Sequence, residues 1–391
     1  MISGSMSIWL ALLCGLLIGY VIARRGTERI KGLQVDKLRR NYFRGLNFLL
    51  NEQPDKAIEV FLQIAEVDNH TVETHLALGS LFRRRGEADR AIRLHQNLIA
   101  RPNLTADQKS VALLELGEDY MRAGLLDRAE VLFTDLLTVD THAAPALRQL
   151  ISICQQERDW FRAIEHTRRL EKITGENQGR LIAHFLSELA NAACQKGDVA
   201  SAENLVREAN HSDRHAVRPR LIEGRLAMQR GDWRSAANAF EKALENDVDF
   251  VPEALPQIIL CLEKLQEPMR IRSYLESLSE RYPGVSPVLA MARRIEDEEG
   301  IGPAMTYLSK RLRQRPSVRG LAALVELQIQ ASQGEAREQL MSLRELFRQL
   351  IADQAVYRCS YCGFGSRSHF WQCPGCKNWG SIKPVHGVAG D

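Results

Sequence analysis

Apolar residues recur along most of the chain with the spacing of amphipathic helices, and turn residues divide the pattern into segments of about a dozen residues. From residue 38 to 318 the same motif returns with a period of about 34 residues. A small residue near the start of every second helix marks the frame. This position is occupied by Ala57, Ala91, Ala129, Ala163, Ala202, Ala236, Arg270 and Ala304. Successive spacings are 34, 38, 34, 39, 34, 34 and 34, which predicts a stack of helix pairs.

Three further positions repeat in this frame. A small residue lies twelve positions earlier, a turn glycine five earlier and an aromatic ring four later. Examples are Gly45, Gly79, Gly117 and Gly224; Gly86, Gly124, Gly197 and Gly231; and Phe61, Phe133, Phe240 and Tyr274. Two helices pack closely where one presents glycine and the other alanine, and the ring fills the space beside that contact. The turn glycine permits the left-handed residue that ends the first helix.

The period, the small–aromatic spacing and the turn glycine resemble the tetratricopeptide repeat. The resemblance covers residues 38–318, and 319–352 fit a degenerate cap. We therefore expect an all-α superhelical solenoid of eight to nine units over 38–354. Units 144–177 and 251–318 lack the first glycine, and we expect them to be distorted or tightly covered. The resemblance implies a concave groove that binds a peptide or protein; the alternative is a spacer.

The N-terminal segment is predicted to be a membrane anchor. Residues 6–23 carry no charge, and seven basic residues follow between 24 and 40. A cleaved signal peptide would need its basic residues before the apolar run. Basic residues stay on the cytoplasmic side. We therefore predict an uncleaved transmembrane anchor at 1–25, a basic juxtamembrane linker at 26–37 and a single-pass inner-membrane protein whose bulk faces the cytoplasm.

Residues 355–391 form a different kind of segment, in which β-favouring aromatics, glycines and cysteines replace the helical pattern. Cys359, Cys362, Cys373 and Cys376 form two CxxC turns separated by ten residues. Two such turns can aim four thiolates at one point, which predicts one tetrahedral metal ion per chain, iron or zinc. His369 is a weaker alternative ligand, since four thiolates complete the shell. Such a small module needs the metal in order to fold.

Composition and sequence motifs limit the classes of function that we expect for the protein. The 52 basic and 49 acidic residues leave a net charge of +3, which gives no general signal for nucleic acid. Motifs of phosphate-binding loops, zinc proteases and serine hydrolases are absent from the sequence, so we predict that the protein is not an enzyme. Two rivals to a binding scaffold stay open at this point. One is a rubredoxin-like redox protein, and the other is a zinc-ribbon protein that binds nucleic acid through the module, with Trp371 and Trp379 as stacking rings.

The order of parts is more specific than either repeat or cysteine module. Anchor, basic stretch, repeats and CxxC-x10-CxxC, with DYMRAGLLDRAE at 119–130 and CPGCKNW at 373–379, resemble the lipopolysaccharide assembly protein B family of Gram-negative bacteria. The resemblance implies an adaptor that promotes degradation of the deacetylase LpxC by the membrane protease FtsH and contacts a membrane regulator that senses lipopolysaccharide. Homo-oligomers are compatible with it, and no nucleic-acid partner is expected. Because the module follows the last helix closely, we also predict that it docks on the final repeats.

Overall fold

The computed structural model describes residues 41, 43–45, 47–48, 51, 53–67, 72–352, 354–388 and 390–391. The predicted anchor at 1–25 and the basic linker at 26–37 lie outside these residues. Among the helices that the structure describes, none combines the length and apolar character needed to cross a bilayer.

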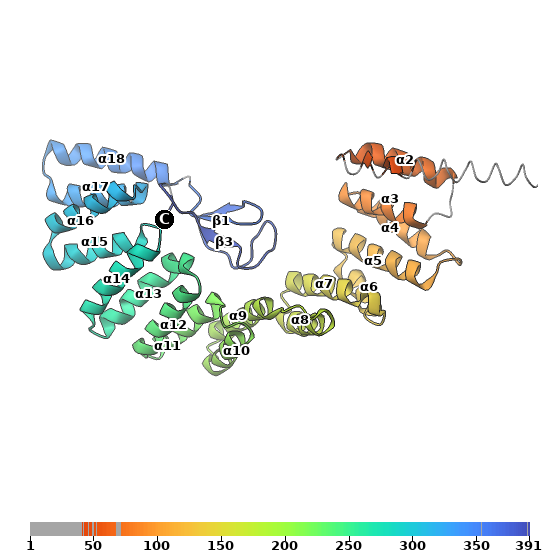
Figure 1. Cartoon of the computed structure of the whole chain (residues 1–391), viewed down its shortest axis with the longest axis horizontal. Helices are drawn as coiled ribbons and strands as arrows, with labels where there is room; N and C mark the ends of the chain where they lie inside the picture. Colours follow the sequence, from red (N-terminus) through yellow and green to blue (C-terminus); the bar gives the residue numbers. More distant parts are fainter. Residues whose placement is uncertain are drawn as a thin grey trace, which may run out of the picture. The chain divides into compact units, whose positions relative to one another are not determined.

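The chain separates into two compact units at the Glu157–Arg158 bond (Figure 1). The first unit contains α2 (Pro54–Val67), α3 (Val72–Arg84), α4 (Ala88–Ile99), α5 (Ala106–Arg122), α6 (Leu126–Leu136) and α7 (Asp140–Glu157). The helices of the second unit are α8 (Trp160–Thr174), α9 (Gly179–Gln195), α10 (Val199–Ser212), α11 (Val217–Gln229), α12 (Trp233–Asn246), η1 (Val248–Phe250), α13 (Val251–Lys264), α14 (Pro268–Arg281), α15 (Ser286–Glu299), α16 (Ile301–Gln314), α17 (Val318–Ala331) and α18 (Glu335–Ala352). A sheet of β1 (Tyr357–Cys359), β2 (Gly365–Ser366) and β3 (Ile382–Pro384) completes it.

Consecutive helices pack against each other in pairs, and the second helices carry the predicted small residue. All seven alanines of the frame are fully buried, each with an exposed fraction of 0%. A side chain larger than a methyl group would not fit where two helix backbones approach this closely. The predicted tetratricopeptide-type solenoid of helix pairs is therefore confirmed for the described repeats.

The first-helix glycine lies against the aromatic ring of the second helix. A Cβ atom added to Gly224 would lie 2.6 Å from the ring of Phe240, and one added to Gly117 would lie 2.5 Å from Phe133. The glycine thus makes room for the aromatic ring of the second helix. At Gly79 the ring is that of His95, 2.2 Å from the same hypothetical atom. The first-helix position therefore carries no side chain where the second-helix position carries a large ring.

The turns confirm one expectation and correct another. Gly86, Gly124, Gly197 and Gly231 all have positive φ angles between 75° and 83°, as the left-handed turn requires. In the repeat assigned to Arg270, however, the buried position belongs to Ile271, which is 1% exposed. Arg270 instead pairs with Glu241 and Glu267 at the surface. The frame shifts by one residue because α14 begins at Pro268 and Gln266 takes the left-handed turn, with φ of 56°.

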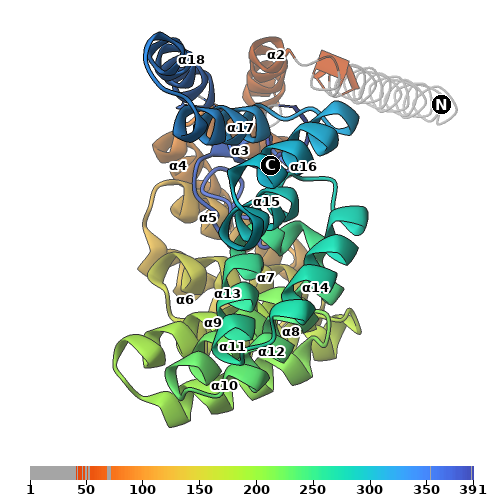
Figure 2. The same cartoon turned by 90° about the vertical axis from the view of Figure 1, so that its left-hand side faces the viewer.

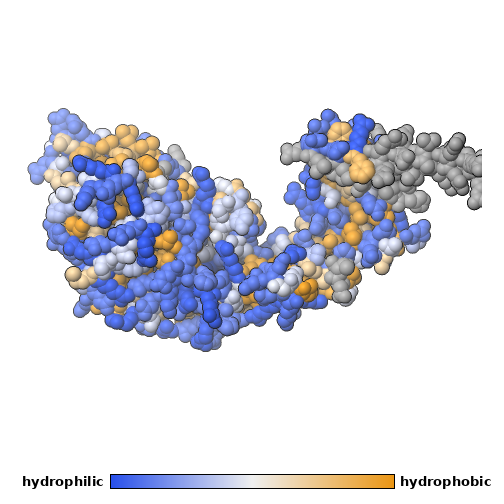
Figure 3. Space-filling model, viewed as in Figure 1, coloured by the Kyte–Doolittle hydropathy of each residue, from blue (hydrophilic) through white to orange (hydrophobic). Residues whose placement is uncertain are grey.

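The last helix and the sheet differ in how they are covered. No residue of α18 is buried, and apolar residues gather over α17 and α18 in the space-filling view (Figure 3). The sheet has the order β2–β1–β3 with antiparallel neighbours. Tyr357 on the central strand pairs with Ser366 on one side and Pro384 on the other. The sheet therefore fixes the backbone at both ends of the cysteine segment.

Candidate metal centre and its contact with the repeats

The two CxxC segments have the same backbone shape. In each, the residue after the second cysteine has a positive φ, 75° at Gly363 and 60° at Lys377. The amide of that residue donates to the carbonyl of the first cysteine, Gly363 to Cys359 at 3.0 Å and Lys377 to Cys373 at 2.9 Å. Glycine adopts this conformation without strain, whereas lysine does so at some cost. Lys377 thus repeats the turn made at Gly363, although its side chain makes this conformation less favourable.

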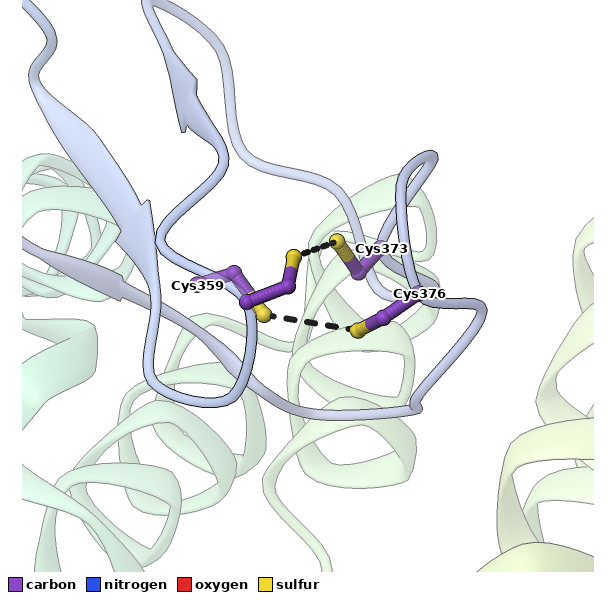
Figure 4. Close-up of side chains that lie close together, drawn as sticks. Cys359, Cys373 and Cys376 are labelled. Atoms are coloured by element: carbon purple, nitrogen blue, oxygen red, sulfur yellow. Dashed lines mark hydrogen bonds between the residues drawn. The ribbon is translucent and has the colours of Figure 1, made fainter. Parts of the chain in front are cut away.

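The four sulfur atoms converge on one point. All lie within 4.8 Å of one another, with 3.6 Å from Cys359 to Cys376 and from Cys362 to Cys373. Figure 4 shows Cys359, Cys373 and Cys376 turned toward each other from two loops of the sheet domain. Cys359 and Cys373 are buried, whereas Cys362 is exposed. Four thiols at this separation suit one ion, iron or zinc, in tetrahedral coordination.

Hydrogen bonds favour the thiolate form of Cys359 and Cys376. At Cys362, by contrast, an opposing backbone hydrogen bond from Phe364 is outweighed by burial and the three neighbouring thiols, which raise the pKa of Cys362 to about 11. The Ser381 hydroxyl, 3.3 Å from the Cys359 sulfur, and the backbone N–H of Cys362 lower the pKa of Cys359 to about 6. The backbone N–H and the side-chain amide of Asn378 lower the pKa of Cys376, and that amide lies 3.4 Å from its sulfur. Donors of this kind orient ligating thiolates and stabilise their charge. Cys359 and Cys376 are thus prepared for a cation by the loops that carry them.

His369 lies outside the cluster that the four sulfur atoms form. Its ring packs edge-on against Phe250 at 5.3 Å, Tyr357 at 5.6 Å and Trp371 at 4.6 Å between ring centroids. Burial lowers the pKa of His369 to about 4, so the ring is neutral at physiological pH. His369 therefore packs among aromatic rings of the interface and is not one of the four converging metal ligands.

Trp371 and Trp379 join the metal domain to the repeats. Trp371 stacks on Phe250 with centroids 5.1 Å apart and planes 10° from parallel. Trp379 stacks on His184 at 5.1 Å and meets Trp160 edge-on at 6.0 Å. Rings held in this way are not available to stack on bases, which removes the observation that supported nucleic-acid binding.

Arg218 of α11 lies beneath both tryptophans. Its guanidinium carbon is 5.4 Å from the Trp371 ring centroid and 5.7 Å from that of Trp379. The side chain is 4% exposed and pairs with Glu188 at 2.8 Å. A desolvated cation between two ring faces is one of the stronger contacts of its kind, worth about 2 kcal/mol.

Polar contacts surround this aromatic interface. Tyr357 donates to Glu253 at 2.5 Å, Lys383 pairs with Asp247, and His386 contacts Asp249 at 3.0 Å. Burial raises the pKa of Glu253, with a smaller opposing effect of the Tyr357 hydrogen bond.

The metal domain thus docks on α8, α9, α11, η1 and the start of α13. The expectation that it would dock on the final repeats is wrong for the rings, because the rings that receive Trp371 and Trp379 belong to earlier helices. It holds for the end of the chain, where Val388 and Asp391 contact Tyr282, which directly follows α14, and residues of α15 and α17. Arg218, His184 and Phe250 were not singled out from sequence, because their repeat positions carry no signal of a partner more than 100 residues away.

Family comparisons agree with these parts. Residues 357–384 match the rubredoxin metal binding domain. Residues 74–107 and 222–256 match the tetratricopeptide repeat. Fold and cysteine cluster together define a tetratricopeptide-repeat protein with a C-terminal rubredoxin-type metal-binding domain.

Two relatives cover nearly the whole chain. Lipopolysaccharide assembly protein B of Escherichia coli (strain K12) is 35% identical over 373 residues, covering 95% of this chain and 96% of its own. The Haemophilus influenzae protein of the same name is 32% identical over 376 residues, covering 94% and 95%. The chain therefore belongs to the lipopolysaccharide assembly protein B family.

A solved structure with partial similarity is that of the MamA protein. It is 22% identical, with 48% of this chain and 97% of that chain covered and a TM-score of 0.33. We draw nothing from this match.

Proposed function

We propose that the chain is a cytoplasm-facing, membrane-anchored scaffold in lipopolysaccharide assembly. The observation that carries the proposal is the docked metal domain. Its aromatic rings and a buried arginine join it to a repeat solenoid, in a chain whose relatives bear the name of a lipopolysaccharide assembly protein. These are parts of a binding protein rather than of an enzyme, since the metal site has four protein ligands and no position left for substrate.

The membrane anchor remains a proposal from sequence. Residues 6–23 are uncharged and are followed by seven basic residues before residue 41. The positive-inside rule then places the repeats in the cytoplasm. A phosphatase reporter that is active in the periplasm, fused after Asp391, should be inactive; an active fusion would contradict this topology.

In this proposal the metal ion stabilises the fold of the small sheet domain. Cys359, Cys362, Cys373 and Cys376 would hold one iron or zinc ion, which supplies the folding energy of the small sheet domain. The folded domain presents Trp371 and Trp379 to the repeats. The solenoid, shaped in this way, would bring LpxC to FtsH at the membrane, and a membrane regulator that senses lipopolysaccharide would control that step.

The test replaces one ligand in cells and follows LpxC. Cys373→Ser should remove the metal and raise LpxC abundance several-fold. Arg367→Ala, an exposed change in the same domain, should leave both unchanged. An LpxC level that stays normal in cells where the Cys373→Ser chain is present without metal would refute the proposed link.

A further inference from the structure

The side chain of Asp391 is completely buried against the repeats. Its carboxylate accepts hydrogen bonds from Tyr282 at 2.5 Å and from Ser286, and it pairs with Arg319. The end of the chain lies beside α15 and α16 in both views (Figure 1 and Figure 2). Two hydroxyl donors and a guanidinium around one carboxylate form a complete recognition site for an anion.

The recess is shaped for this group. Tyr282 is 0% exposed. A Cβ atom on Gly284 would lie 2.6 Å from the Asp391 carboxylate, so a larger residue there would close the recess. One backbone hydrogen bond of 2.7 Å joins α17 to the tail, from the Val318 amide to the Val388 carbonyl. A second of 2.7 Å, from the Asp391 amide to the Val385 carbonyl, folds the tail on itself. The tail, residues 385–391, is thus held as a bound peptide would be.

An open groove leads to the same site. It has a volume of about 460 Å³ and runs between α13 and α15 over apolar side chains that include Leu255, Ile259 and Leu289. Its lining also includes Ser286 and Arg319, two of the residues that hold Asp391. A peptide lying in this groove could therefore place a carboxylate on Ser286 and Arg319, but only where Asp391 has left.

We propose that Tyr282, Ser286 and Arg319 form a recognition site for the carboxylate of an acidic peptide with apolar residues, and that Asp391 is its resident occupant. The tail acts as an internal competitor that must leave before a partner's acidic segment binds. Since β3 precedes the tail directly, occupation by a partner also loosens the edge of the metal domain. The proposal gives the scaffold a binding site for one kind of partner, and it rests on the proposed function only for the biological source of the peptide.

Binding is measured with the chain's own tail as the probe. The probe is a fluorescent peptide of residues 383–391, acetylated and amidated so that the Asp391 side chain carries its only negative charge. It is titrated into the full chain, wild type and Asp391→Asn, with metal content verified. We expect at least about tenfold tighter binding to Asp391→Asn, a difference of about 1.4 kcal/mol, because its own tail fills the site less well. Hydrogen exchange at the Val318 amide should rise in the same variant.

Matched controls decide the outcome. The double variant Asp391→Asn with Arg319→Gln should lose the peptide, and Asp391→Asn with Tyr282→Phe should weaken it, both with unchanged melting of the metal domain. A peptide with asparagine in place of its aspartate should not bind. Equal binding of the two peptides, indifference to Arg319→Gln or no binding to the Asp391→Asn chain would each overturn the site. None of these results depends on lipopolysaccharide regulation. A normal LpxC level in Cys373→Ser cells would therefore refute the proposed function without bearing on this recognition site.

Discussion

A glutamate at the same repeat position pairs with an arginine in each of the two compact units, but the surroundings of the two arginines differ. Glu115 and Glu188 both lie fourteen residues before the frame alanine of their own helix pair, Ala129 and Ala202. Each pairs with an arginine of a neighbouring first helix. Arg83 contacts Glu115 at 2.7 Å, Glu118 at 2.8 Å and Asp119 at 2.7 Å.

Arg218 in the second unit has Glu188 and two tryptophan faces instead. In the first unit the cation is balanced by carboxylates; in the second it is balanced by one carboxylate and the rings of a docked domain. The same solenoid therefore supports an ionic network in one place and an aromatic interface in another. The difference depends on residues outside the repeat motif.

Loss of the metal should have the largest effect and should affect the second unit. Cys373→Ser removes a ligand, and structural metal binding is worth about 10–16 kcal/mol in small domains. We expect metal content to fall from one ion per chain to near zero and tryptophan emission to shift to longer wavelength as Trp371 and Trp379 become exposed. Amide exchange in α3–α6 should stay unchanged. If the emission stays the same after metal loss, the domain folds without it.

Removing the central carboxylate of the first unit should rank second. Asp119 is fully buried and binds both Arg83 and the ring nitrogen Nδ1 of His95, the latter at 2.5 Å. Asp119→Ala leaves the buried His95 ring without its carboxylate and removes one of the three carboxylates around Arg83, which keeps Glu115 and Glu118. This should destabilise the unit by about 3–5 kcal/mol. Amide exchange in α4 and α5 measures this. Asp107→Ala, an exposed change in α5, is the control and should cost within about 0.5 kcal/mol; similar values for both would mean that the network contributes little.

Replacing the interface arginine should have a smaller effect. Arg218→Met keeps the aliphatic volume but loses the Glu188 ion pair and both ring contacts, at a cost of about 2–3 kcal/mol. Exchange of amides 357–384 should rise while metal content stays at one ion. Arg220→Met, which removes a surface pair with Glu223, should change exchange little. An interface as well protected as in the wild type would show that Arg218 is not a docking contact.

The smallest expected effect is a dependence on pH. Burial lowers the pKa of His184 to about 3 and that of His369 to about 4, both from 6.5. The unfolded chain takes up protons below about pH 6.5 and the folded chain does not, so stability is constant above that pH and falls as pH decreases toward 4. At pH 5.5 the loss is about 1.4 kcal/mol for each histidine.

Denaturant unfolding followed by tryptophan emission at pH 7.5 and 5.5 measures this loss, with metal content checked at both values. His184→Gln should remove about half of the difference. A difference that persists in full in this variant would assign the pH dependence to other groups.

The repeats were largely predictable from sequence, whereas the docking was not. A 34-residue period follows from local packing, and each alanine that it marked is fully buried. The frame position predicted at Arg270 was wrong by one residue, because spacing alone cannot distinguish one register from the next. The burial of Ile271 shows that Ile271 occupies the frame position. The four cysteines were identified by their spacing, and their sulfur atoms do converge.

Contacts such as Tyr357 with Glu253 join residues 104 positions apart. They follow no period, and no pattern in one sequence pairs them. The same holds for Asp391, a single carboxylate whose site is assembled from Tyr282, just after α14, and from residues of α15 and α17. Long-range recognition between a solenoid and its own extension therefore leaves no local pattern in the sequence.

The short connection after α18 has a consequence for anything that competes with the metal domain or its tail. Residues 353–356 alone separate α18 from β1, so the domain is a tethered ligand of its own repeats. Short tethers give effective concentrations on the order of millimolar. A free peptide with the same intrinsic affinity would need a similar concentration to displace half of the tails. A partner present at micromolar levels would succeed only with additional contacts elsewhere on the chain, or when both are confined to one membrane surface.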